Sequence, residues 1–107
     1  MPQIKPNLNY IKKIADGDNN IERKLISIIK NEFPTEKKEF EQQLLDKKLT
    51  QASFTVHKLK HKFVVLGFES QYELINNFEK QLQNSNTALL PEFKTILSQL
   101  ELFVGQL

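Results

Sequence analysis

The sequence predicts an all-α fold, an antiparallel up-down four-helix bundle with one or two additional short N-terminal helices. Apolar residues recur at intervals of three or four positions along almost the whole chain, which is the helical period. Only three glycines and four prolines are present, too few for the turns of a many-stranded sheet. The 107 residues are enough for one core, so residues 1–107 are expected to form a single domain.

The N-terminal third is expected to contain two helices separated by a tight turn. The apolar residues of the first, short helix are Leu8, Ile11 and Ile14. Gly17 suits the left-handed conformation that ends a helix, and Asp18 offers an N-cap for the next one. The apolar residues of this second helix are Ile21, Leu25, Ile28 and Ile29. It is expected to end near Phe33 and Pro34, because proline is poorly tolerated inside a helix.

The middle of the chain is expected to contain a third and a fourth helix. Thr35 is a candidate N-cap for the third, and Glu36 and Glu39 are favourable in its first turn. Its buried side is expected to consist of Phe40, Leu44 and Leu45. Thr50 is the expected cap of the fourth helix, which carries both histidines of the chain and ends at Gly67.

Two further helices are expected in the C-terminal third. The fifth should begin at Glu69 or Ser70, and its apolar residues are Tyr72, Ile75, Phe78 and Leu82. Pro91 fits a helix only in the first turn, so the last helix should begin between Thr87 and Leu90. Its wide apolar stripe consists of Leu89, Phe93, Ile96, Leu97, Leu100, Phe103, Val104 and Leu107. Four helices of about 15 residues joined by short loops are typical of an up-down bundle.

The composition excludes several classes of function. The chain has no cysteine, which excludes disulfides, thiolate metal sites and a thiol nucleophile. Its net charge of +2 does not favour a general nucleic-acid or membrane role. The first residues lack the apolar run of a signal peptide, and no apolar stretch approaches the length of a membrane span. The expected compartment is therefore the cytoplasm, with neither nucleic acid nor membrane as partner.

The expected fourth helix contains the most informative stretch of the sequence. His57 and His61 lie one helical turn apart, in a segment with five lysines and no acidic residue between Asp46 and Glu69. At about 100° per residue, both histidines face away from the apolar stripe of the helix. Phe54 and Val64 lie on the same outward side. This face is either a docking surface or an ordinary exposed surface with scattered apolar residues.

Several kinds of chemistry are open to the two histidines. Histidines four residues apart can share a metal ion, but two ligands do not make a site and the nearby lysines would repel a cation, so no metal site is expected. Lys58 and Lys62 are expected on a different side of the helix from Lys60, so the lysines form a solvated face rather than one cationic stripe for nucleic acid. His57 could be a solvated surface residue or a nucleophile.

A nucleophilic role for His57 agrees with its surroundings in the sequence. Neighbouring cations favour the neutral imidazole, which can attack phosphorus, and they would offset the charge of about −2 on the phosphoryl group that it acquires. No catalytic triad, phosphate-binding glycine loop or nucleotide motif accompanies it. The chain is therefore expected to be no enzyme in its own right, but a carrier of a group that another protein transfers.

These residues resemble a known family. The pattern His57-x-Leu59-Lys60, followed by Leu66-Gly67, is similar to that of the histidine-containing phosphotransfer (HPt) domains of multistep two-component signalling. The resemblance implies that His57 is the phosphorylated residue and exchanges the group with an aspartate of a response-regulator receiver domain or a hybrid sensor histidine kinase. It also implies that no cofactor is bound here and that Mg²⁺ is held by the receiver.

The resemblance assigns further residues to the site. Lys60 would offset the charge of the phosphoryl group, and Glu79, one helix later, would accept a hydrogen bond from one imidazole nitrogen so that the other can attack. Glu79 falls on the apolar stripe of its expected helix, where a carboxylate needs a partner. The docking surface for the partner would consist of Phe54, Lys58, His61, Val64 and Gly67. A bundle closed by its own core should be monomeric.

The sequence departs from the family pattern at one point. His61 replaces the glycine that follows the lysine, and Lys62 replaces the small residue after it. The glycine leaves room for the partner's active site, so His61 either restricts the range of partners or itself contacts the phosphoryl group or the receiver. The alternative function is a helical-bundle interaction module that docks a receiver or kinase domain without phosphotransfer.

Overall fold

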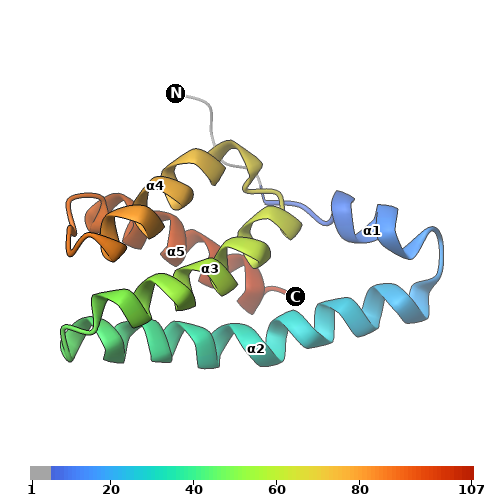
Figure 1. Ribbon diagram of the computed structural model, residues 1–107. Helices are drawn as coiled ribbons and strands as arrows, with labels where there is room; N and C mark the ends of the chain where they lie inside the picture. Colours follow the sequence, from blue (N-terminus) through green and yellow to red (C-terminus); the bar gives the residue numbers. More distant parts are fainter. Residues whose placement is uncertain (1–5) are drawn as a thin grey trace.

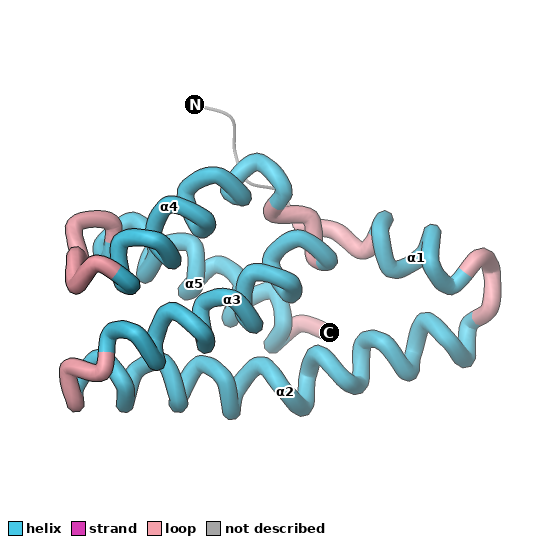
Figure 2. Tube along the Cα trace, in the orientation of Figure 1, coloured by secondary structure: helices cyan, strands magenta, loops and turns pink. Residues whose placement is uncertain are grey.

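The structure is a computed structural model that describes residues 6–107, and all regular secondary structure in that range is helical, with no strand (Figure 1). Its elements are α1 (Asn9–Ala15), α2 (Asn19–Leu45), α3 (Leu49–Val65), the short 3₁₀ helix η1 (Glu69–Gln71), α4 (Tyr72–Gln83) and α5 (Leu90–Gly105). Short loops join them (Figure 2). The predicted all-α class is therefore confirmed. Residues 1–5, for which the sequence predicts no signal peptide, lie outside the described part.

The helices pack in chain order around one core. Helix α3 contacts both α2 and α4, and α5 contacts α2 and α4. Helix α1 lies alongside the N-terminal part of α2, and this pair projects past the other helices at one end (Figure 1). Several apolar residues expected to be buried are exposed: Ile14, Ile21, Ile28, Leu45 and Tyr72. Three of them, Ile14, Ile21 and Ile28, belong to the projecting pair of α1 and α2.

The sequence prediction is wrong about the extent of α2. It runs without a break for 27 residues with Pro34 inside it, so the two helices expected on either side of this proline are one. Phe33 and Phe40 explain why, because they lie two turns apart on one face of α2 and are both buried. Burying two such rings contributes more than the backbone hydrogen bond that a proline removes. Thr35 is accordingly a residue within α2, not a cap.

Three features of the predicted helix ends are confirmed. The Asp18 carboxylate accepts hydrogen bonds from the backbone N–H groups of Asn20 and Ile21, which confirms it as the N-cap of α2. Gly17 adopts φ +84° in the preceding turn, as predicted. Helix α5 begins at Leu90 with proline in its first turn, also as predicted.

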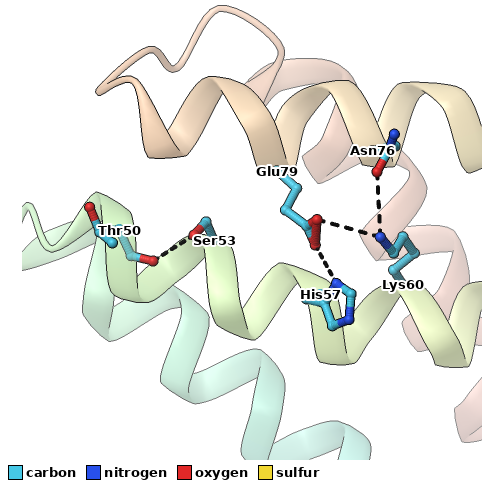
Figure 3. A network of polar contacts seen from close by, with 6 residues as sticks. All are labelled: Thr50, Ser53, His57, Lys60, Asn76 and Glu79. Carbon is cyan, nitrogen blue, oxygen red and sulfur yellow. Dashed lines mark hydrogen bonds and ion pairs between the residues drawn. The ribbon is translucent and has the colours of Figure 1, made fainter.

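The predicted cap of α3 is wrong. The helix begins at Leu49, so Thr50 already lies in its first turn, and no side chain caps the end. The backbone carbonyl of Thr50 accepts a hydrogen bond from the Ser53 hydroxyl instead (Figure 3).

Phenylalanine rings from four helices pack against one another in the core. Phe93 of α5 contacts three other rings, with centroid separations of 5.3 Å to Phe40 of α2, 5.8 Å to Phe63 of α3 and 4.7 Å to Phe78 of α4. All four side chains are buried. Edge-to-face and tilted ring contacts have preferred geometries, so they restrict how neighbouring helices can slide. These contacts restrain α4 relative to α3 at Phe78, the residue next to Glu79.

In the range that the structure describes, no helix combines the length and the apolar character that crossing a membrane requires.

Candidate functional site

Helix α3 has one apolar face and one exposed face, as the helical wheel predicts. Four residues of the apolar face, and the C-cap Leu66 that follows them, are fully buried: Ala52, Val56, Leu59, Phe63 and Leu66. His57 lies on the opposite side, with 55% of its side chain exposed. The periodicity of the sequence therefore placed this histidine correctly, at the surface and reachable by a partner.

His57 is held from one side by a carboxylate of the neighbouring helix. Its Nδ1 atom lies 2.8 Å from Oε1 of Glu79, which projects from α4 toward α3 (Figure 3). Glu79 belongs to the buried face of α4 and is only 9% exposed. The packing of the two helices thus carries a buried carboxylate to the edge of the core, where it contacts the one ring nitrogen that faces inward.

Lys60 contacts the second oxygen of the same carboxylate. Its Nζ atom lies 3.4 Å from Oε2 of Glu79 and 3.5 Å from Oδ1 of Asn76, both on α4 (Figure 3). The ring of Tyr72, one turn before Asn76, has its centroid 5.5 Å from the same ammonium group. Lys60 is only 7% exposed, so its charge is directed into the interface between α3 and α4 rather than toward solvent.

The geometry specifies the protonation pattern of the site. The Lys60 ammonium group lies 3.4 Å from Oε2 of Glu79, the arrangement of an ion pair with a carboxylate. An ionised carboxylate can only accept hydrogen bonds, so the Nδ1 atom of His57 must carry the hydrogen. The neutral ring then has its lone pair on Nε2, the nitrogen not bound by Glu79. The cluster therefore presents an oriented imidazole ring at the surface of the molecule.

The other predicted contact residues of α3 differ in exposure. Phe54 is 63% exposed and His61 is exposed, whereas Val64 is half-buried. Lys58 is exposed, and its Nζ lies 3.7 Å from a carboxylate oxygen of Glu39 on α2. The His57 and His61 rings contact each other edge to face, with centroids 5.0 Å apart. The outward face of α3 thus carries two imidazole rings in contact and an exposed phenyl ring.

Gly67 has a backbone role that the sequence did not indicate. Its φ of +93° lies in the left-handed region, which favours glycine. A Cβ atom at this position would lie 2.6 Å from the side-chain amide nitrogen of Asn7 and 2.9 Å from its backbone nitrogen. The Asn7 N–H donates to the carbonyl of Leu66 at 2.9 Å. Gly67 thus lets the N-terminal segment pack against the end of α3.

Lys62 corrects another sequence prediction. It was expected on a solvated face, yet it is only 9% exposed, and its Nζ lies 2.9 Å from Glu32 and 3.0 Å from Glu36. Both carboxylates belong to α2 and flank Pro34. The sequence prediction placed Glu32 and Glu36 on either side of a helix break at this proline. In the structure α2 is unbroken, and both carboxylates lie beside Lys62.

The sequence reasoning missed two residues of the site, Asn76 and Tyr72. Both lie on α4, three and seven residues before Glu79, so they share its face of the helix. Counting back from Glu79 in the sequence would have identified them as neighbours of the site. Within residues 6–107 no group of three or more histidine, aspartate or glutamate side chains is arranged to hold a metal ion.

Comparison of the chain with protein-family models, with curated proteins and with solved structures finds no match in any of the three.

Proposed function

We propose that this protein is a phosphocarrier of the HPt type, which accepts a phosphoryl group on His57 and donates it to an aspartate of a receiver domain, or the reverse. The observation that carries the proposal is the linked set His57, Glu79 and Lys60. An exposed imidazole is held through Nδ1 by a buried carboxylate, and that carboxylate is held by a buried ammonium group. An ordinary surface histidine needs no such support.

The support fits nucleophilic attack on phosphorus. The Nε2 lone pair of His57 forms the new N–P bond while the P–O bond of the aspartyl phosphate breaks and the aspartate leaves as a carboxylate with the bonding electrons. No proton has to move in this step. The ring becomes positively charged, and the Glu79 carboxylate at 2.8 Å from Nδ1 stabilises that charge. The reverse reaction uses the same contacts.

The rest of the catalysis belongs to the partner. Phosphoryl transfer depends mainly on positioning and on stabilising charge, which the receiver domain and its Mg²⁺ would supply. The exposed surface of Phe54 and His61 beside His57 would contact the receiver domain or a hybrid sensor histidine kinase. Helices α2 to α5 would then be the antiparallel up-down bundle of the family. We also propose that the carrier acts as a monomer in the cytoplasm.

The proposal is tested by incubating the protein with phosphorylated receiver domains from the same genome. We expect a band that is retarded in Phos-tag gels, labile in acid and stable in alkali. His57→Gln should abolish that band while leaving the thermal midpoint of unfolding almost unchanged, because the side chain is exposed. Lys94→Gln, at an exposed position of α5, is the matched control and should be labelled normally.

A different result would support the interaction module instead. If no receiver labels the protein, yet one of them binds it and the binding is weakened by Phe54→Ala, the exposed face of α3 serves docking alone. The exposure of Phe54, 63%, is the observation that favours this second function.

A further inference from the structure

The lysines around His57 are all directed toward carboxylates. Lys60 is buried against Glu79, and Lys62 is buried against two carboxylates of α2. Lys58 is exposed but lies beside Glu39. A phosphoryl group on His57 would add a charge of about −2 at the surface. None of these three ammonium groups can offset that charge without weakening an ion pair that it already makes.

His61, on the outward face of α3, is a basic residue that is not paired with a carboxylate of the described residues. Its side chain is exposed and makes no hydrogen bond or ion pair with the described residues. Its ring lies against that of His57, with centroids 5.0 Å apart and planes at 87°. Because Glu79 occupies Nδ1 of His57, a phosphoryl group on that ring must be attached at Nε2. The imidazole of His61 is thus a hydrogen-bond donor that no acceptor already occupies, in ring contact with the histidine that would carry an Nε2-linked group.

We propose that His61 is a phosphoryl-positioning residue, whose ring N–H donates a hydrogen bond to an oxygen of the phosphoryl group on His57. The inference rests on the proposed function and assigns to His61 the contact that the buried Lys60 does not offer. His57 would then be supported from two sides. Glu79 and Lys60 orient the ring from the interface between α3 and α4, and His61 holds the transferred group on the solvent side.

The proposal has a kinetic consequence. In hydrolysis of a phosphohistidine, water attacks phosphorus, the N–P bond breaks and the ring nitrogen recovers its lone pair. The transition state is loose, so the phosphoryl oxygens carry less charge than in the phosphohistidine itself. A donor to those oxygens therefore stabilises the ground state more than the transition state. His61 should lengthen the lifetime of phosphorylated His57.

The test uses a reagent that requires no partner protein. Potassium phosphoramidate phosphorylates the full chain directly: the N–P bond to His57 forms, the reagent's own P–N bond breaks, and its nitrogen leaves as ammonia after taking a proton from water. The lifetime of the label on the His57 peptide is followed by mass spectrometry at fixed pH. Wild type is compared with His61→Phe, which retains a ring without a donor, and His61→Gln, which retains an N–H donor without the ring.

We expect a lifetime shortened roughly three- to tenfold in His61→Phe, the effect of losing one hydrogen bond to a charged group at an exposed position, and within about twofold of wild type in His61→Gln. Equal lifetimes in all three proteins would overturn the proposal, as would a glutamine variant that behaves like the phenylalanine variant. Label found on His61 in place of His57 would overturn it too. Thermal unfolding checks that both variants are folded.

The same proteins are incubated in parallel with phosphorylated receiver domains. If receivers never label His57 but the phosphoramidate lifetimes follow the expected order, the carrier function fails while the contact made by His61 is supported. If receivers label His57 and the lifetimes are equal, the carrier function is supported and the role of His61 is overturned.

Discussion

Two lysines of α3, two residues apart, are buried in ion pairs on opposite sides of the helix. Lys60 points to α4 and lies 3.4 Å from Glu79, whose other oxygen contacts the exposed His57. Lys62 points to α2 and lies 2.9 Å from Glu32 and 3.0 Å from Glu36. We refer to these as the α4-side cluster and the α2-side cluster. They are almost equally buried, at 7% and 9% exposure of the lysine.

The difference lies in what each cluster presents to solvent. The α4-side cluster ends in an imidazole with a free nitrogen, whereas the two acids of the α2-side cluster only pair with the lysine. Burial removes water from the charged groups of both clusters, and the ion pairs must offset the unfavourable desolvation energy. Buried charge is therefore common to both clusters, and the proposed site differs in the exposed imidazole that its carboxylate holds. Substitutions should therefore separate chemistry from stability.

The largest effect is expected on the chemistry of the α4-side cluster. In Glu79→Gln the amide oxygen should turn to the Lys60 ammonium, so the amide NH₂ faces Nδ1 of His57 and selects the tautomer with hydrogen on Nε2. That tautomer has its lone pair on Nδ1, facing the amide, and none on Nε2 for attack, so the rate of labelling by a phosphorylated receiver should fall on the order of 10²- to 10⁴-fold. Single-turnover labelling measures it.

The control for this variant is Glu73→Gln, at an exposed position of the same helix. It makes the same change of charge and should be labelled at the wild-type rate. Circular dichroism establishes that both proteins are helical. A labelling rate in Glu79→Gln equal to that of the control would remove Glu79 from the mechanism and make the two clusters equivalent.

The second prediction concerns stability and the α2-side cluster. Lys62→Met leaves Glu36, which is largely buried, without a cation, and the free energy of unfolding should fall by about 2–3 kcal/mol. Urea denaturation measures this loss. The labelling rate per folded molecule should remain within about twofold of wild type, because the α4-side cluster is untouched.

Two further variants sharpen that result. Lys80→Met, at an exposed position of α4, should change the free energy of unfolding by less than about 0.5 kcal/mol. Adding Glu36→Gln to Lys62→Met should recover part of the loss, because it removes the uncompensated buried charge. If Lys62→Met instead lowered labelling and left stability intact, the division between the two clusters would be wrong.

The smallest effect is expected at a third, more exposed lysine. Lys37 of α2 lies 3.3 Å from Glu41 and 3.3 Å from Glu101 of α5. Partial burial lowers the pKa of Lys37, but the two carboxylates more than offset this, so its pKa lies above the ordinary value of 10.5. Lys37→Met should cost about 0.5 kcal/mol of stability at neutral pH, as is typical for exposed pairs.

The pH dependence of this pair follows from the raised pKa. The contribution of Lys37 to stability should be fully present below pH 10.5, the ordinary value, and should be lost as the pH rises through the higher pKa of the folded state. Urea denaturation of wild type and Lys37→Met across the alkaline range should show two curves that converge. Curves that stay parallel through that range would mean that the charge of Lys37 does not contribute.

The sequence predicted the features that depend on local pattern. The outward position of His57 and the buried stripe of α3 follow from the helical period, and the start of α5 follows from Pro91. The pairing of Glu79 with His57 was expected from a family resemblance joined to the need of a buried carboxylate for a partner. Neither the spacing nor the charge of these residues alone could have placed them 2.8 Å apart.

What the sequence could not predict depends on packing between distant segments. Pro34 argues locally for a helix end, and only the burial of Phe33 and Phe40 against other helices keeps α2 intact. From the sequence Lys62 was expected to be solvated, but the unbroken α2 places Glu32 beside it. Gly67 fits a docking motif in sequence, and its contact with Asn7 becomes visible only when the chain folds back.

The ring of Tyr72 over the Lys60 ammonium gives the protein an optical probe of its own site. The chain has no tryptophan and two tyrosines, and the other, Tyr10, belongs to α1. Emission excited in the tyrosine band therefore comes from two rings only, one of them 5.5 Å from the ammonium group of the α4-side cluster. With Tyr10→Phe the remaining signal would belong to Tyr72 alone, and events at His57 could be followed in real time without an attached label.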